Sequence, residues 1–414
     1  MQHAIDLACH LGKQRIWIDA LCIIQDDNND WNREAARMAD VYENSFLTIA
    51  AWGASSSDQG LFTIRDPLLL NACKLYEIPE ADKSMFASIE KVRGSPYELP
   101  SSYSPLYKRG WVIQERLFAP RTLNVGSYVS WECRTGSCTE IRPDLHDGLY
   151  PFKNIFELGE EIHQNDRTLE LWNQNIVREF TSARLTKKGD RLVAISGAIR
   201  RIGLQRNWRN IHGLWEPFLV EQLQWRRSGR DKMPEIFTSN RTGAAPSWSW
   251  ASIDAPVDYP HVSYWNRDCS HKVILAQKIP AKSQTNEESA SESPSLALKG
   301  HLFELVIVDW SKELWCSTIA IGGRECDSWW FSPDLSDPVI TTSCWFLLLS
   351  IITAPPSGPR SRQYRFATGL ALMEVADKPG KYERIGFLSG YLKGFPRKLR
   401  VQFDESPTQD ITII

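Results

Sequence analysis

Apolar and polar positions near the N-terminus follow two different periods. Residues 15–24 are nearly all apolar and β-prone, as a strand buried on both faces must be. Residues 45–51 are β-prone as well. Between these runs, apolar side chains recur at helical spacing, at Trp31, Ala35, Met38 and Tyr42. The order predicts a βαβ unit, and therefore an α/β fold with a parallel sheet.

Composition shifts divide the rest of the chain. We predict an α/β domain over residues 1–150 and a helical or mixed region over residues 151–280. Residues 281–294 are rich in Ser and Glu and cannot bury apolar area, which predicts a flexible linker. Residues 295–414 contain several strand-like apolar runs, so we predict a β-rich C-terminal region.

Two further elements are predicted within the α/β domain. Residues 109–117 have a helical pattern that stops before Pro120, which cannot continue a helix. Residues 123–133 alternate around Gly126 and Ser127, a pair suited to a tight turn. This alternation predicts a β-hairpin.

The net charge and the cysteine content of the chain limit the classes of function that we expect. The 414 residues carry a net charge of −2, so no global field favours nucleic acid or an anionic membrane as partner. The longest apolar run, residues 344–352, is far shorter than the ~20 residues of a membrane helix. Nine scattered cysteines and the lack of a secretory pattern at the N-terminus indicate free thiols in a reducing compartment. We therefore expect a cytoplasmic protein.

Several chemical signatures are missing. The sequence has no nucleophile elbow, phosphate loop, dinucleotide fingerprint or His-Glu-x-x-His motif, which disfavours the simple hydrolase, ATPase and dehydrogenase classes. Cys133 and Cys138, with His146 downstream, lack the second Cys pair of a zinc site, so we predict no metal. Nothing local would lower the pKa of Cys22, which we interpret as a buried structural cysteine.

Acidic and polar side chains follow the first predicted strand. Asp26 and Gln25 fall where a parallel strand gives way to its helix, the edge at which α/β sheets bind ligands. The alternative is that Asp30 or Asn29 caps the helix and the other carboxylates favour its positive end. Asp19 lies inside the apolar run, where a carboxylate requires a partner such as Arg109 or Arg116, or a helix N-terminus.

Three motifs, in order, resemble those of fungal heterokaryon incompatibility (HET) domain proteins. The first is IWIDALCIIQDD, continued by DWNREAARMADVYENSFLTIAA and GLF. The second is RGWVIQERLFAPRTL followed by WECR, and the third is APSWSWAS at residues 245–252. Such domains usually begin upstream of the position that matches Met1. We therefore expect a chain truncated at its N-terminus, without the usual first strand of the domain.

The resemblance implies a Rossmann-like or TIR-like parallel sheet core with helices. It also implies an effector role in non-self recognition and programmed cell death. HET domains have been considered remote relatives of TIR domains, some of which cleave NAD with a Glu on a comparable helix. In that comparison Glu34 is the catalytic candidate and NAD the candidate substrate, with no resident cofactor. Glu34 follows Trp31 by three positions, whereas the family has four. A surface ion pair with Arg37 is the alternative role of Glu34.

The second motif supplies further candidate binding residues. Arg109, Trp111, Gln114 and Glu115 combine an aromatic ring with amide and charged groups, which suits a ribose or adenine. Together with Asp19, Gln25 and Asp26 they form the predicted substrate site. The residues of the second motif could instead lock the hairpin onto the sheet. A non-catalytic module that signals by self-association, or with other incompatibility proteins, and an inactive remnant are the rival interpretations.

Overall fold

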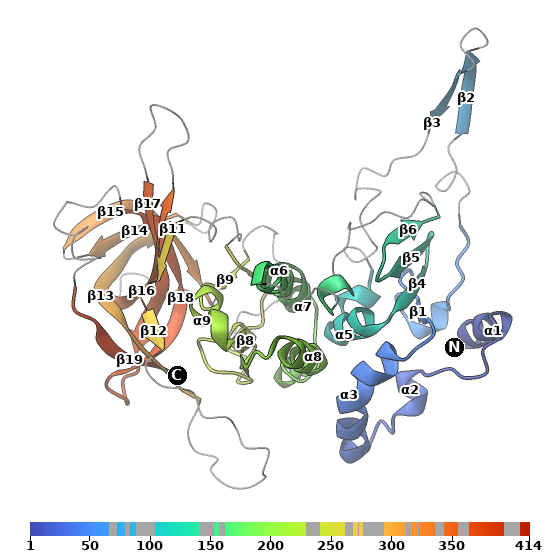
Figure 1. The fold of residues 1–414 in the computed structure, drawn as a ribbon, viewed down its shortest axis with the longest axis horizontal. Helices are drawn as coiled ribbons and strands as arrows, with labels where there is room; N and C mark the ends of the chain where they lie inside the picture. Colours follow the sequence, from blue (N-terminus) through green and yellow to red (C-terminus); the bar gives the residue numbers. More distant parts are fainter. Residues whose placement is uncertain are drawn as a thin grey trace. The chain divides into compact units, whose positions relative to one another are not determined.

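The computed structural model places the chain in two compact units (Figure 1). Unit 1 comprises residues 1–186 and 193–206, and unit 2 comprises residues 187–192 and 207–414. The borders predicted at residues 150, 280 and 294 stay predictions. The structure describes residues 1–65, 73–78, 83–87, 104–140, 153–156, 162–228, 241–260, 268–271, 273–275, 294–310, 316–321, 323–335, 343–354, 364–392 and 406–414.

Unit 1 contains a small mixed sheet with the strand order β1-β4-β5-β6. Strand β1 (Thr48–Ala50) pairs in parallel with β4 (Arg121–Val125). Strands β4, β5 (Val129–Cys133) and β6 (Ser137–Thr139) pair antiparallel. The predicted hairpin at residues 123–133 is therefore confirmed. A Cβ atom on Gly126 would lie 2.5 Å from the Trp52 ring, so this turn needs glycine because an indole packs against it.

The strand predicted at residues 15–24 is wrong. Residues 13–18 carry no strand assignment, and α2 (Asp19–Cys22) is a single helical turn. Ile18 is extended, with φ −136° and ψ 123°, but a strand also requires a hydrogen-bonded neighbour, and the described residues supply none to this segment. Cys22 is exposed, so the prediction of a buried structural cysteine is also wrong.

The helix predicted after this segment and the helix predicted at residues 109–117 are both confirmed. Helix α3 (Asn28–Glu43) buries Ala35, Met38 and Ala39 on one face. Its N-cap is Asp27, whose carboxylate accepts hydrogen bonds from the backbone amides of Asn29 and Asp30. The cap predicted at Asp30 or Asn29 is corrected accordingly. Helix α5 (Gly110–Phe118) stops before Pro120, as expected.

Further helices complete unit 1. Near its start lies α1 (Gln2–His10), which contains no fully buried residue. Helix α6 (Ile162–Leu171) continues through a π-helical segment (Trp172–Val177) into α7 (Arg178–Ser182), and α8 (Ser196–Arg206) contacts α3 and α5. A separate hairpin is formed by β2 (Cys73–Ile78) and β3 (Lys83–Ala87).

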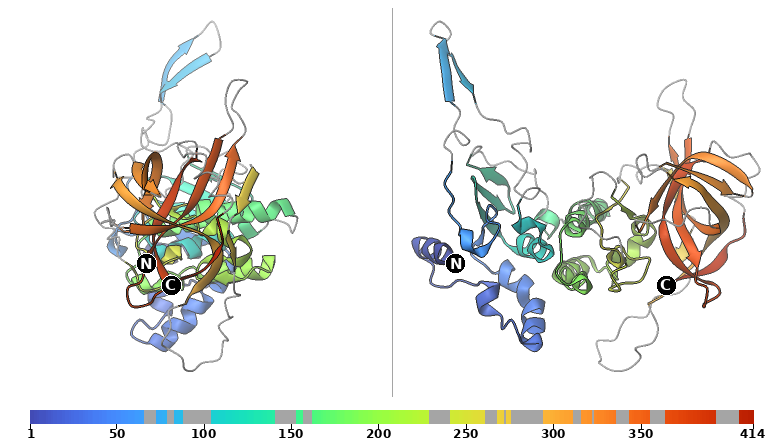
Figure 2. Two further views of the ribbon diagram at one scale, coloured as in Figure 1. Left: turned by 90° about the vertical axis from the view of Figure 1, so that its left-hand side faces the viewer. Right: turned by 180° about the vertical axis from the view of Figure 1, so that it is seen from behind.

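Unit 2 contains a closed antiparallel barrel. The long strand β13 (Leu296–Trp310) pairs with both β14 (Cys316–Ile321) and β16 (Ser343–Ala354). The ring continues through β15 (Arg324–Pro333), β18 (Lys381–Tyr391) and β17 (Tyr364–Glu374) (Figure 2). This ring confirms the β-rich C-terminal part expected from the apolar runs.

The barrel core is apolar and densely filled. Leu305, Ile307, Trp329, Phe346 and Leu388 are among its fully buried members. Strand β19 (Gln409–Ile413) pairs with β13 and β18, while β11 (Asp268–His271) and β12 (Val273–Leu275) extend the sheet. Shorter elements precede them: β7 (Asn210–Ile211), β8 (Leu214–Trp215), α9 (Leu219–Gln222), β9 (Arg226–Arg227) and β10 (Val257–Asp258).

Some sequence predictions fall outside these elements. Most of the predicted linker, residues 281–293, lies outside the described residues, as does His146. Within the described part of the chain, no helix combines the length and apolar character needed to cross a membrane.

Candidate functional site

The packing of α3 against α5 brings Tyr42 and Glu115 together. These residues are 73 positions apart, yet the Tyr42 hydroxyl donates a hydrogen bond of 3.0 Å to Oε2 of Glu115. One turn earlier on α5, the Trp111 ring meets the Trp31 ring edge-on, with centroids 5.7 Å apart. Trp111 and Glu115 are four residues apart and therefore lie on one face of α5. Each of these four side chains is half-buried.

Glu115 has an unusual electrostatic environment. Burial raises the pKa of its carboxyl from 4.5 to about 7, and the negative charge of Asp19 adds to that rise. The hydrogen bond from Tyr42 and the positive charge of Arg109 act in the opposite direction. Burial and the neighbouring Glu115 raise the pKa of the Tyr42 hydroxyl. At neutral pH, Glu115 can therefore both donate and accept a proton.

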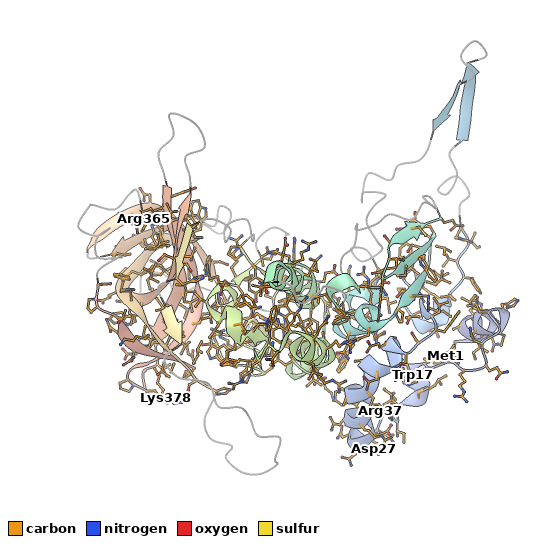
Figure 3. The ribbon with its side chains drawn as sticks, in the orientation of Figure 1. Met1, Trp17, Asp27, Arg37, Arg365 and Lys378 are labelled. Atoms are coloured by element: carbon orange, nitrogen blue, oxygen red, sulfur yellow. The ribbon has the colours of Figure 1, made fainter. Side chains whose placement is uncertain are left out.

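The segment that precedes α3 supplies Asp19 and Trp17 to this cluster. Asp19 opens α2, and its Oδ1 accepts a hydrogen bond of 2.8 Å from the amide of Ala20. The Trp17 ring meets the Tyr42 ring edge-on, with centroids 5.7 Å apart. Figure 3 labels Trp17 in the segment that leads into α2 and α3. Asp19, Tyr42, Arg109 and Glu115 thus form one electrostatically coupled group, which we call the Glu115 cluster.

Gln25 and Asp26 have different surroundings. The amide of Gln25 donates to the backbone carbonyls of Asp19, at 3.2 Å, and Ile23, at 2.9 Å. Gln25 therefore stabilises the turn that positions Asp19, although its side chain is exposed. Asp26 is exposed, and within the described part of the chain no hydrogen bond or ion pair joins it to the Glu115 cluster.

Glu34 lies in a network of arginines. Its side chain is 14 % exposed, and Oε1 is 3.3 Å from Nε of Arg33 and 3.6 Å from Nη1 of Arg37. The pair with Arg37 is the i,i+3 ion pair anticipated as its alternative role. None of its contacts within the described part of the chain involves Asp19 or Gln25. Asp30, beside it, accepts from the amide of Ile24 and pairs with Arg33.

Gln114 and Arg116 serve the packing of unit 1. Oε1 of the buried Gln114 accepts a 3.0 Å hydrogen bond from the amide of Gly197, which fastens α8 to α5. Arg116, one of the partners expected for Asp19, instead pairs with Glu132 at 2.9 Å and Glu179 at 3.3 Å. Arg109 is exposed at the start of α5 and is the nearby cation that acts on Glu115.

Sequence reasoning missed Tyr42 and Trp17 as site residues. Tyr42 was recognised only as the last apolar position of a helix, and Trp17 as one residue of an apolar run. The signal that could have identified Tyr42 is its hydroxyl on the apolar side of that helix, because a half-buried phenol needs a hydrogen-bond partner. The described residues hold no group of three His, Cys, Asp or Glu side chains suited to a metal ion.

Comparison with known proteins adds one finding. The family model for heterokaryon incompatibility protein (HET) matches residues 1–115. No curated protein and no solved structure matches the chain. The matched segment includes every member of the Glu115 cluster and ends at Glu115 itself. For residues 1–115, the match confirms the HET domain that the sequence motifs resemble.

Proposed function

From the HET domain in residues 1–115, which implies a function related to heterokaryon incompatibility, we propose an effector that acts through the Glu115 cluster. The proposed reaction is hydrolysis of an N-glycosidic bond in a nucleotide, with NAD as first candidate substrate. Loss of that nucleotide would arrest or kill the cell in which the effector is active.

The observation that carries this proposal is the hydrogen bond between Tyr42 and Glu115 beside a second carboxylate, Asp19. Breaking a bond between a base and ribose builds positive charge on the sugar, which a nearby carboxylate stabilises. When two carboxyl groups lie in different environments, one can stabilise the positive charge while the other transfers a proton. Arg109, exposed at the start of α5, is suited to a phosphate group.

Glu34 remains a candidate catalytic residue because the resemblance to HET domains implies it. Its carboxylate is held by two cations, Arg33 and Arg37, and would have to exchange them for substrate. Among the described residues, none forms such an ion pair with the Glu115 carboxyl, which is hydrogen-bonded to Tyr42. We therefore assign the central role to Glu115 and a subordinate one to Glu34.

Substitution of both glutamates tests the assignment. Purified full-length protein is incubated with NAD, and free base is measured over time. Glu115→Gln is expected to lower the rate by about 10²-fold or more, the usual contribution of a positioned proton-transferring group. Glu34→Ala is expected to lower it by less than about tenfold, since it removes only a supporting charge. Glu170→Gln, which breaks an exposed ion pair of α6 with Arg167, is the control and should leave the rate unchanged.

The assignment of roles would be reversed if Glu34→Ala abolished activity and Glu115→Gln did not. If well-folded wild-type protein released no base, enzymatic action on NAD would be wrong.

A second candidate function, signalling by self-association, is favoured by one observation. Three apolar side chains in residues 16–24 are exposed: Ile16 by 39 %, Leu21 by 61 % and Ile24 by 57 %. Exposed apolar side chains this close together along the chain suit an association surface.

Mass measurement in solution tests the second candidate. Light scattering coupled to size-exclusion chromatography is expected to show concentration-dependent assembly that the double substitution Leu21→Glu and Ile24→Glu reduces at least tenfold. Leu204→Glu, at a 78 % exposed apolar position of α8, is the matched control. A wild-type chain that stays monomeric at every concentration would rule out this function.

A further inference from the structure

We propose that the Glu115 cluster takes a purine nucleotide and cleaves its base–ribose bond, with Glu115 donating a proton to the departing purine. The inference rests on the proposed function and narrows it, because the two classes of base leave ribose by different chemistry. Nicotinamide in NAD is a cation and departs as a neutral molecule without a proton. A purine would depart as an anion unless an acid protonates a ring nitrogen.

The balanced step uses one water molecule. The bond between C1′ and N9 breaks, its electron pair goes to the purine, and the carboxyl proton of Glu115 goes to a ring nitrogen. The oxygen of water bonds to C1′, and the proton that water loses goes to the Asp19 carboxylate. Exchange with solvent then restores both carboxyl groups. The products are a free purine and a ribose phosphate.

The placement of Glu115 fits the role of the acid. Tyr42 holds Oε2, and within the described part of the chain no hydrogen bond occupies Oε1. A carboxyl held by one oxygen keeps the other for a ligand. Glu115 is half-buried, so the residue is partly shielded from bulk water and still partly accessible to a ligand.

Neighbouring side chains fit a purine ring and a phosphate. Trp111 lies one turn before Glu115 on the same helix face, is half-buried, and has an indole large enough to stack on a two-ring base. Its edge-on contact with Trp31 holds the orientation of the ring. The exposed guanidinium of Arg109 supplies a bidentate contact for phosphate.

The protonation of Glu115 near neutral pH supports its assignment as the acid. Burial, together with Asp19, raises the pKa of Glu115 to about 7, so a large fraction of the molecules carry the required proton at neutral pH. The hydrogen bond from Tyr42 opposes this rise. Tyr42 is therefore a positioning residue: it fixes Glu115 and sets the pH at which the acid works.

Product analysis with two substrates tests the inference. Full-length protein is incubated with AMP and, separately, with NAD, and released adenine and nicotinamide are separated and measured. We expect adenine from AMP, at a rate that falls as the pH rises above about 7, since the acid then loses its proton. Glu115→Gln should lower adenine release at least 100-fold, and Glu170→Gln should not change it.

The variant Tyr42→Phe gives an independent readout. Because it removes a hydrogen bond that lowers the pKa of Glu115, the falling limb of the pH profile should move to higher pH. A merely structural role for Tyr42 would lower the rate without that shift.

The outcomes separate the two proposals. Nicotinamide release without adenine release overturns the purine inference and leaves nucleotide cleavage standing. Adenine release that Glu115→Gln does not change overturns the assignment of the acid. Release of neither base, by protein with a wild-type circular dichroism spectrum, overturns both proposals.

Discussion

Replacement of Arg384 by alanine is expected to lower the free energy of unfolding of unit 2 by about 3–5 kcal/mol, the usual cost of breaking a buried ion pair. Arg384 lies on β18 and is fully buried. Its Nε donates to Asp334 at 3.2 Å, and its two terminal nitrogens donate to the carbonyls of Leu223 and Trp225. The guanidinium also lies 3.4 Å from the centroid of the Trp225 ring.

The cost arises because the substitution leaves several buried groups without a partner. Asp334 is fully buried, and burial raises the pKa of its carboxyl while Arg384 and Arg241 oppose that rise. Without Arg384, the carboxylate loses its closest cation and two carbonyls lose their donor. The same side chain joins the barrel to the segment that carries Trp225, so its removal also opens that packing.

Urea titration followed by tryptophan fluorescence measures the effect. Lys378→Ala removes one positive charge from an exposed turn and should change stability by less than about 0.5 kcal/mol. The double substitution Arg384→Met and Asp334→Leu should recover much of the loss, because it removes the orphaned carboxylate as well. An Arg384→Ala protein as stable as wild type would contradict the importance of this network.

Replacement of Arg116 by alanine is expected to destabilise unit 1 by a similar amount, about 3–5 kcal/mol. Arg116 is 3 % exposed and joins three elements. Its guanidinium pairs with Glu132 of β5 and Glu179 of α7 and lies 5.2 Å from the centroid of the Tyr107 ring. Glu132 is itself buried, and its Oε1 already has no hydrogen-bond partner among the described residues.

Removal of Arg116 would therefore leave the buried Glu132 without its ion-pair partner. Thermal unfolding followed by near-ultraviolet circular dichroism checks the result. The control Arg167→Ala breaks an exposed ion pair of α6 with Glu170, which is worth no more than about 1 kcal/mol. Equal effects of the two substitutions would show that Arg116 contributes no more than a surface charge does.

The two stability tests also bear on the proposed site. Arg116 follows Glu115 directly on α5, so the two neighbouring side chains have separate tasks. Arg116 is directed to the sheet and α7, while Glu115 is directed to Tyr42 of α3. Loss of activity in a Glu115 variant that keeps wild-type stability would assign that loss to the site and not to the fold.

Local pattern was sufficient for several elements. The helical period and the polar run before it identified α3, and Pro120 marked where α5 ends. The alternation around Gly126 identified the β4–β5 hairpin, and apolar runs identified some of the barrel strands, such as β16. In each case neighbouring residues carry the information, because caps, turns and periodic burial act over a few positions.

Only the tertiary structure decided the state of residues 15–24 and the composition of the candidate site. An apolar, β-prone run becomes a strand only when another strand supplies hydrogen bonds, and the described structure offers this run none. Likewise, the sequence indicated Asp19, Arg109 and Glu115 as candidates, but the packing of α3 on α5 chose Tyr42 as the partner of Glu115. That choice depends on contacts between residues far apart in the chain, which no local period records. The sequence by itself thus indicated the HET domain of residues 1–115 and most of the local elements named above, whereas long-range packing determined which polar groups meet.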